Sequence, residues 1–175
     1  LGHTCSFQIS QLNPNSIYTY TLSNSTFKSD TFSFRTQQLW QRRNDPPTFK
    51  IAFGSCTYIN DTSFDRPGKA YGQSTSLFKS LLEDHPTAMI WGGDNVYFRE
   101  GDWETAANMA ARYTHTRSEP NIKKVLNTIP NYAVWDDHDF GPNDSNGSFQ
   151  FKNESANVFR QMWPNQGYVQ SSGPA

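Results

Sequence analysis

Trp135-Asp136-Asp137-His138-Asp139 is the stretch that decides the fold and the site, because it delivers acids and a histidine at the end of the apolar run 132–135. Two earlier apolar segments, 49–54 and 87–92, are also followed by polar side chains. In an open α/β sheet the loops at the carboxyl ends of parallel strands form the ligand crevice, so residues at these ends can converge. The sequence therefore predicts one shared site, built from Cys56, Asp94, Tyr97, Asp137 and His138.

Each of these strand ends also has an ordinary structural explanation. A Gly-Asp turn after a strand is usually only a turn, and Tyr97 could be a core aromatic whose hydroxyl is hydrogen-bonded. His138 could be a buried histidine that Asp136 or Asp139 orients, and Cys56 could be an inert buried thiol rather than a stabilised thiolate. The occurrence of three such strand ends in succession favours the site.

Composition limits the classes of partner. The chain has 175 residues, 35% of them hydrophobic and 15% aromatic, which is enough for one packed domain or parts of two. Its formal net charge is -1 and its basic residues are not clustered, so the charge pattern of a nucleic-acid binder is missing. The sequence contains no apolar run near the roughly 18 residues that span a bilayer. We expect a small-molecule partner, and the sequence leaves the oligomeric state open.

The two ends of the sequence suggest a piece of a larger protein. Residues 1–3 show neither an initiator Met nor the apolar core of a signal peptide, and the segment after them reads like the middle of a β domain. We therefore expect that a signal peptide and further strands precede it in a secreted, extracellular or periplasmic protein. A disulfide between Cys5 and Cys56, the only two cysteines, is the less favoured alternative to a free Cys56.

The front of the chain has the pattern of antiparallel strands. Apolar and polar residues alternate at 18–22 and 31–36, with turn residues between the two segments. This predicts the last two or three strands of a small fibronectin-like or immunoglobulin-like β sandwich over residues 1–37. Residues 38–48 end in Asn-Asp-Pro-Pro and are expected to form a stiff polar linker.

Residues 49–175 follow a different pattern, in which strands alternate with helices. Such βαβ units favour a buried parallel sheet and the α/β fold class. The expected strands lie at 49–54, 87–92 and 132–135, and the expected helices at 73–84, 103–115, 121–128 and 152–162.

The chemistry of the candidate residues favours a metal centre. Asp94 and Tyr97 lie three positions apart in a turn, and a phenolate oxygen suits a hard ion such as Fe³⁺. Asp137 adds an oxygen ligand, and His138 adds a group that titrates near neutral pH. The more distant acids Asp65, Asp102 and Asp144 are expected to be solvated loop residues, although Asp144 lies close enough in sequence to be an outer ligand.

Three motifs resemble those of a known family. Gly54-Ser55-Cys56, the segment Gly93-Asp94-Asn95-Val96-Tyr97 and the run 135–145 are similar, in this order, to alkaline phosphatase D, the PhoD-like branch of the metallophosphoesterases. The resemblance covers about the whole chain, is most specific in the last motif, and is weakest at the front. It implies the first half of a four-layer α+β sandwich behind a β domain. Purple acid phosphatases share the Gly-Asp-x-x-Tyr element, but Cys56 stands where they would have an aspartate.

The resemblance also implies roles for individual residues. Cys56, Asp94 and Tyr97 match metal ligands of the family, with Asp94 bridging from Fe³⁺ to a second ion, Ca²⁺. Asp137 corresponds to a ligand of the second site, and Asp136 to a less specific ligand or orienting partner. His138 matches the histidine that touches the phosphate, which makes it the expected catalytic residue.

The expected function is therefore that of a metal-dependent phosphoesterase, in which a metal-bound hydroxide attacks a phosphate ester. The family takes further ligands from later histidine motifs, and this sequence has no histidine after position 138. We expect the chain to be a fragment with doubtful activity of its own. The alternative is a non-catalytic extracellular binding module in which the acids hold structural Ca²⁺.

Overall fold

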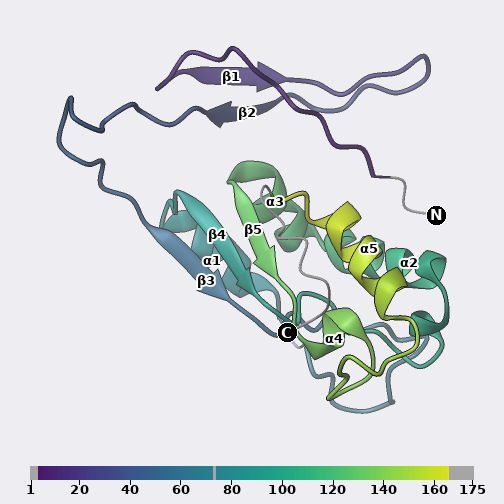
Figure 1. Ribbon diagram of the computed structural model, residues 1–175. Coiled ribbons are helices and arrows are strands. Elements are labelled where there is room, and N and C mark those ends of the chain that lie inside the picture. Colours follow the sequence, from purple (N-terminus) through teal and green to yellow (C-terminus); the bar gives the residue numbers. More distant parts are fainter. Residues whose placement is uncertain (1–3, 73, 166–175) are drawn as a thin grey trace.

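The computed structural model describes residues 4–72 and 74–165, and its centre is a parallel sheet (Figure 1). The strands lie in the order β3 (Ile51–Gly54), β4 (Ala88–Gly92) and β5 (Asn131–Val134). Both pairs are parallel, with Phe53 opposite Ile90 and Ile90 opposite Tyr132. The three strands, the parallel sheet and the α/β class predicted from the sequence are confirmed.

Helices lie between these strands and after the last of them. They are α1 (Ser76–Glu83), α2 (Ala106–Ser118), α3 (Pro120–Thr128) and α5 (Lys152–Met162), together with the short helices η1 (Asp102–Glu104) and α4 (Asp137–Phe140). The helix expected at 103–115 begins later, because the Thr105 side chain accepts a hydrogen bond from Asn108 N and caps the chain there. It ends before Glu119, whose helical conformation Pro120 disfavours. The helix expected at 152–162 has those bounds.

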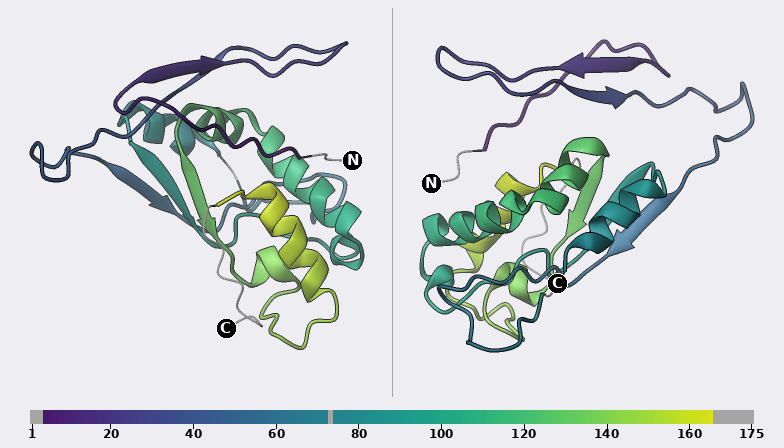
Figure 2. Two further views of the ribbon diagram at one scale, coloured as in Figure 1. Left: turned by 45° about the horizontal axis from the view of Figure 1, so that its top comes forward. Right: turned by 180° about the vertical axis from the view of Figure 1, so that it is seen from behind.

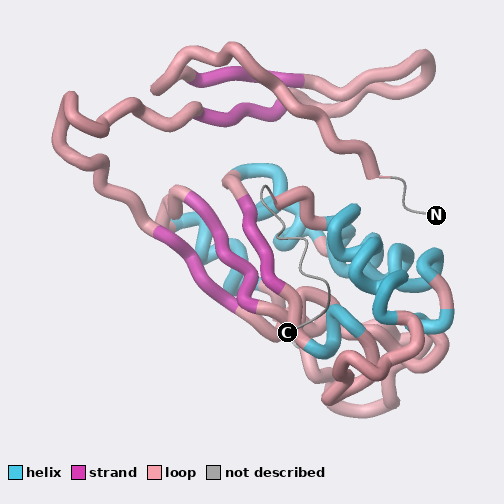
Figure 3. The backbone as a smooth tube through the Cα atoms, viewed as in Figure 1, coloured by secondary structure: helices cyan, strands magenta, loops and turns pink. Residues whose placement is uncertain are grey.

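The helices cover one face of the central sheet (Figure 3). Met89, Trp91 and Ala133 point into this layer and are no more than 5% exposed. The Trp91 ring lies 5.7 Å from the ring of Phe78 on α1 and 5.6 Å from that of Trp163 after α5. Seen from behind in Figure 2, α1 lies directly against the strands. The core of the described residues therefore lies between this face of the sheet and the helices, and between the helices themselves.

The other face of the sheet carries apolar side chains in the open. Ile51, Phe53, Tyr132 and Val134 are between 45% and 71% exposed. The second sheet and further helix layer of the expected four-layer sandwich do not occur among residues 4–72 and 74–165. The structure thus shows a mixed α/β layer pair with one uncovered sheet face.

The front of the chain forms a hairpin. Strands β1 (Ile17–Tyr20) and β2 (Phe32–Arg35) pair antiparallel, with Ile17 opposite Arg35. The stacked rings of Tyr18 and Phe34 lie 5.7 Å apart, and β2 lies beside α3 (Figure 2). In the described part of the chain no second sheet packs on this hairpin, so the expected β sandwich is not shown. No described helix is long and apolar enough to cross a membrane.

Candidate metal centre

The carboxyl ends of the three parallel strands come together at one edge of the sheet. Beyond the last residues of β3 and β4, Cys56 N donates to Gly93 O at 3.2 Å and Thr57 N donates to Asp94 O at 2.8 Å. Gly93 has φ 99°, and a Cβ at this position would lie 2.7 Å from the Cβ of Asp136. Only glycine permits both this conformation and this close approach. The turn after β4 therefore packs directly on the segment after β5.

Three of the predicted site residues form a compact group: the predicted ligands Asp94 and Asp137, and the predicted catalytic residue His138. One ligand atom each of Asp94, Asp137 and His138 lies within 4.8 Å of the other two. Asp94 follows β4, whereas Asp137 and His138 lie on α4 after β5, 43 and 44 positions later in the sequence. Carboxylate oxygens and an imidazole nitrogen at such distances could hold a divalent or trivalent cation.

Tyr97 and Cys56 adjoin this group through Asp94. The Tyr97 hydroxyl donates to Asp94 Oδ2 at 2.9 Å, and Cys56 Sγ lies 3.6 Å from the same oxygen. Cys56 is exposed and free, as expected. The Tyr97 ring lies 4.3 Å from the His138 ring. All five residues predicted to share a site are therefore linked by short contacts.

Asp94 provides the sharpest indication of a cation. The residue is 8% exposed, and its Oδ1 atom is buried without a hydrogen-bond partner in the described part of the chain. A buried carboxylate oxygen that has lost water and gained no donor destabilises the fold by about 1–3 kcal/mol or more. A cation between Asp94, Asp137 and His138 would remove this cost, so the donor set fits a metal.

Two of the predicted ligands have unusual backbone conformations. Cys56 has φ 60° and Asp94 has φ 50°, which places both residues in the left-handed region that residues with a Cβ rarely adopt. Such conformations persist only where the surrounding structure enforces them, and they are frequent at functional sites. The Cys56 Sγ and Asp94 Oδ2 atoms of these two residues lie 3.6 Å apart.

The surroundings of Tyr97 favour a neutral phenol. Burial raises its pKa well above the ordinary value, and the neighbouring Cys56 and Asp94 raise it further. Without a cation, Tyr97 therefore stays protonated and its hydroxyl donates a hydrogen bond to Asp94. A phenolate at this position requires the positive charge of a metal ion.

The short helix α4, which was not predicted, explains the place of Asp136. The Asp136 carboxylate accepts a hydrogen bond from Asp137 N at 2.9 Å and caps this helix. It is exposed and does not belong to the compact group of ligand atoms. Asp137 in turn accepts bonds from His138 N at 3.0 Å and from the backbone amide of Asp144.

Asp139 is a residue whose importance the sequence analysis missed. Its fully buried carboxylate accepts bonds from Asn95 N and Asn95 Nδ2 at 3.1 Å, from the Tyr113 hydroxyl at 2.8 Å and from Asp136 N at 3.1 Å. Burial raises the pKa of Asp139 to about 7, although these bonds oppose the rise. Asp139 fixes the turn after β4 to the start of α4. The acid three positions after a capping aspartate was the available signal.

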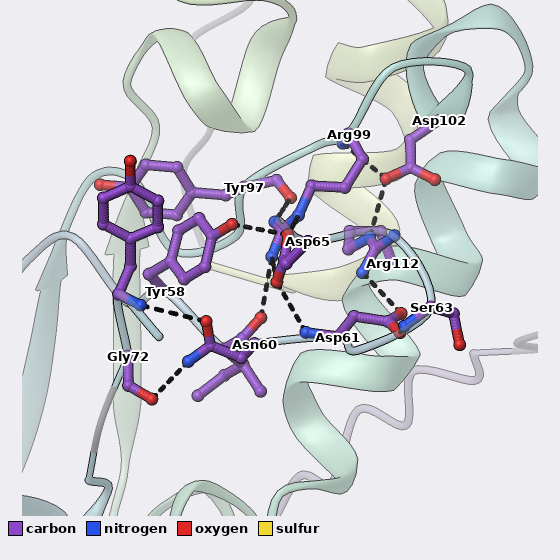
Figure 4. A network of polar contacts seen from close by, with 12 residues as sticks. Tyr58, Asn60, Asp61, Ser63, Asp65, Gly72, Tyr97, Arg99, Asp102 and Arg112 are labelled. Atoms are coloured by element: carbon purple, nitrogen blue, oxygen red, sulfur yellow. Dashed lines mark hydrogen bonds and ion pairs between the residues drawn. The ribbon is translucent and has the colours of Figure 1, made fainter. Parts of the chain in front are cut away.

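Two acids that were expected to be solvated are not. Asp65 pairs with Arg99 at 2.7 Å and Asp102 pairs with Arg112 at 2.7 Å, and the side chains of these acids are only 11% and 15% exposed. The expectation was wrong because each arginine lies on a different segment from its partner. Figure 4 shows the resulting network beside Tyr97.

Comparison with known proteins supports the fold. No family model and no curated protein matches the chain. A solved structure of PhoD superposes with a TM-score of 0.68 at 17% sequence identity, covering 94% of this chain and 34% of the PhoD chain. This chain thus spans about a third of the length of that protein. At this identity the likeness establishes a shared fold.

Proposed function

We propose that this chain belongs to a metal-dependent phosphoesterase that resembles alkaline phosphatase D and hydrolyses small phosphate esters. The proposal rests on one observation above all. Asp94, Asp137 and His138 meet at the carboxyl edge of a sheet whose fold resembles that of PhoD. A secreted or periplasmic location belongs to the same proposal and rests on the family resemblance.

The donor set suggests how two different ions could share the site. Tyr97 and Cys56, which both contact Asp94 Oδ2, offer the phenol oxygen and thiol that suit Fe³⁺. Asp137 lies after the neighbouring strand and would complete a site in which Asp94 reaches toward a second ion such as Ca²⁺. Asp136 would act by capping α4 and so orienting Asp137.

In this proposal, bound cations would supply acidity to a water molecule and positive charge to the phosphoryl oxygens. His138 would bind a phosphoryl oxygen or protonate the leaving oxygen, because imidazole nitrogens can serve as hydrogen-bond donors and as general acids. The Asp139 hydrogen bonds would keep α4, and with it His138, in a fixed position relative to Asp94.

Hydrolysis of aryl phosphate monoesters and diesters by the intact protein tests the proposal. We expect activity that a chelator abolishes and that added iron and Ca²⁺ restore. Asp94→Asn should lower kcat/KM by more than about 100-fold, beyond the range of changes made outside the ligands. The matched control is Asp84→Asn, because Asp84 is an exposed acid before β4, at the amino-terminal edge of the sheet.

Hydrolysis that is absent or independent of metal would contradict the proposal. Metal binding without any hydrolysis would instead favour a module with a structural Ca²⁺ site.

A further inference from the structure

Arg99 is the most fully bonded cation near the candidate centre (Figure 4). Its Nε and Nη2 atoms donate to the two oxygens of Asp65 at 2.7 and 3.0 Å. Nη2 also donates to Ile59 O at 2.9 Å, and Nη1 donates to the carbonyl oxygen of Tyr97. The guanidinium fork thus ties the loop around residues 59–65 to the backbone of a predicted metal ligand.

The same guanidinium holds an aromatic ring. Its Cζ atom lies 4.2 Å from the centroid of the Tyr58 ring, which is a cation–π distance. The Tyr58 hydroxyl donates to Asp65 Oδ1 at 2.7 Å, so the acid that pairs with Arg99 also orients the ring. Tyr58 is therefore fixed both at its face and at its hydroxyl.

Tyr58 in turn packs against Tyr97, a residue of the candidate centre. Its ring lies 5.1 Å from the ring of Tyr97, and Tyr97 lies 4.3 Å from the ring of His138. Figure 4 shows Tyr58 beside Tyr97, on the side of the arginine network. Two rings packed against Tyr97 leave it little freedom to rotate its hydroxyl away from Asp94.

We propose that Arg99 is a positioning residue for the centre, which fixes the Tyr97 side chain against Asp94 and His138 through the Tyr97 carbonyl and the Tyr58 ring. The inference rests on the proposed function in that it takes Tyr97 as a metal ligand. This positioning role requires arginine, because only a planar guanidinium can bind a carboxylate through two nitrogen atoms, donate to two carbonyl oxygens and lie over an aromatic ring at the same time.

Arg112 offers a matched control. It is 5% exposed and also forms two ion pairs, with Asp102 at 2.7 Å and with Asp61 at 3.1 Å. Its guanidinium lies 5.3 Å from the Phe64 ring, rather than on Tyr58. Arg112→Gln therefore removes a similar buried ion pair from the same network without removing the support of Tyr58.

The chemical shift of the His138 imidazole protons in the metal-free intact protein reports on the position of Tyr97, because the ring current of the neighbouring Tyr97 ring changes this shift. A displacement of the signal is a change in this chemical shift. His138→Gln assigns the signal, and Tyr97→Leu gives the full displacement. We expect Arg99→Gln to produce most of this displacement and Arg112→Gln to produce little. In the metal-loaded protein, Arg99→Gln should lower kcat about 10-fold with KM nearly unchanged.

A second pair of variants covers the case in which Arg99→Gln fails to fold. Tyr58→Leu removes the supporting ring and should displace the His138 signal, whereas Tyr58→Phe keeps the ring and should not. An unmoved signal in Arg99→Gln or Tyr58→Leu would overturn the inference, and so would an equal displacement in Arg112→Gln. A displaced signal in a protein without phosphatase activity would uphold the positioning role and refute the proposed function.

Discussion

The two faces of the central sheet differ sharply, although the same three strands build both. One face packs Met89, Trp91 and Ala133 beneath the helices, while the other leaves Phe53, Tyr132 and other apolar side chains exposed. Burial on the first face supplies the hydrophobic free energy that holds the described fold together. The open face contributes little to that stability, and it is the surface on which a second layer of the sandwich expected from the sequence would pack. The candidate centre lies at the carboxyl edge of the sheet, where the two faces meet.

The largest expected effect is a difference in unfolding free energy between two variants, each of which removes an aromatic side chain from one face of the sheet. Trp91 is 2% exposed and Phe53 is 71% exposed. Trp91→Ala should lower the free energy of unfolding by about 3–5 kcal/mol, the usual cost of removing a buried aromatic side chain. Phe53→Ala should change it by about 0.5 kcal/mol or less, as at other exposed positions. Urea unfolding of both variants measures the difference. Similar losses would show that the Phe53 face is covered in the intact protein.

The next largest effect on the unfolding free energy is expected at Asp139, at the edge of the sheet where the strands end. Asp139→Ala leaves several buried donors of Asn95, Tyr113 and Asp136 without an acceptor, so we expect a loss of about 2–3 kcal/mol in unfolding free energy. Tyr113→Phe removes a single donor and should cost about 1 kcal/mol. Asp139→Ala should also weaken metal binding about 10-fold or more, because it releases α4 from the turn that carries Asp94. Undiminished metal affinity in this variant would exclude the role of Asp139 in holding α4 against the turn that carries Asp94.

The third expected effect is a pH dependence of the unfolding free energy, which the polar network around Asp65 should produce and the apolar core should not. Burial alone would raise the pKa of Asp65, but hydrogen bonds from Arg99, Asp61 N and Tyr58 outweigh it and hold the pKa well below the ordinary value of 3.8. The stability that Asp65 contributes is therefore present above this ordinary value and is lost as the pH falls through the lower folded-state pKa.

Unfolding free energies of the native protein and of Asp65→Asn, measured on both sides of pH 3.8, test this assignment. The native protein should lose stability more steeply below that value than the variant does. Parallel curves would mean that the Arg99–Asp65 pair does not stabilise the fold.

Local patterns predicted much of the architecture. The strands of the central sheet and α5 follow from apolar runs and from helical spacing, because burial of one face imposes these periods on the sequence. The hairpin strands were predicted for the same reason. Their assignment to a β sandwich depends on a partner sheet, and no periodicity within 18–22 or 31–36 can specify one.

The candidate site was predictable only in part. Cys56, Asp94 and Tyr97 each follow an apolar strand, and the parallel topology brings such positions together. The role of Asp139 was hidden, because its partners Asn95 and Tyr113 lie 44 and 26 positions away. The same limit applies to Arg99 and Asp65, which lie 34 positions apart and pair only after the loops have folded.

The absorption spectrum of the aerobically purified intact protein, read together with its iron content, tests most directly whether the strand ends build one metal centre. We predict bound iron and a visible charge-transfer band, because a phenolate at Tyr97 would donate electron density to Fe³⁺. Tyr97→Phe should keep the fold and lose or strongly shift the band. A colourless protein that contains iron and hydrolyses phosphate esters, or a band that survives Tyr97→Phe unchanged, would contradict the account.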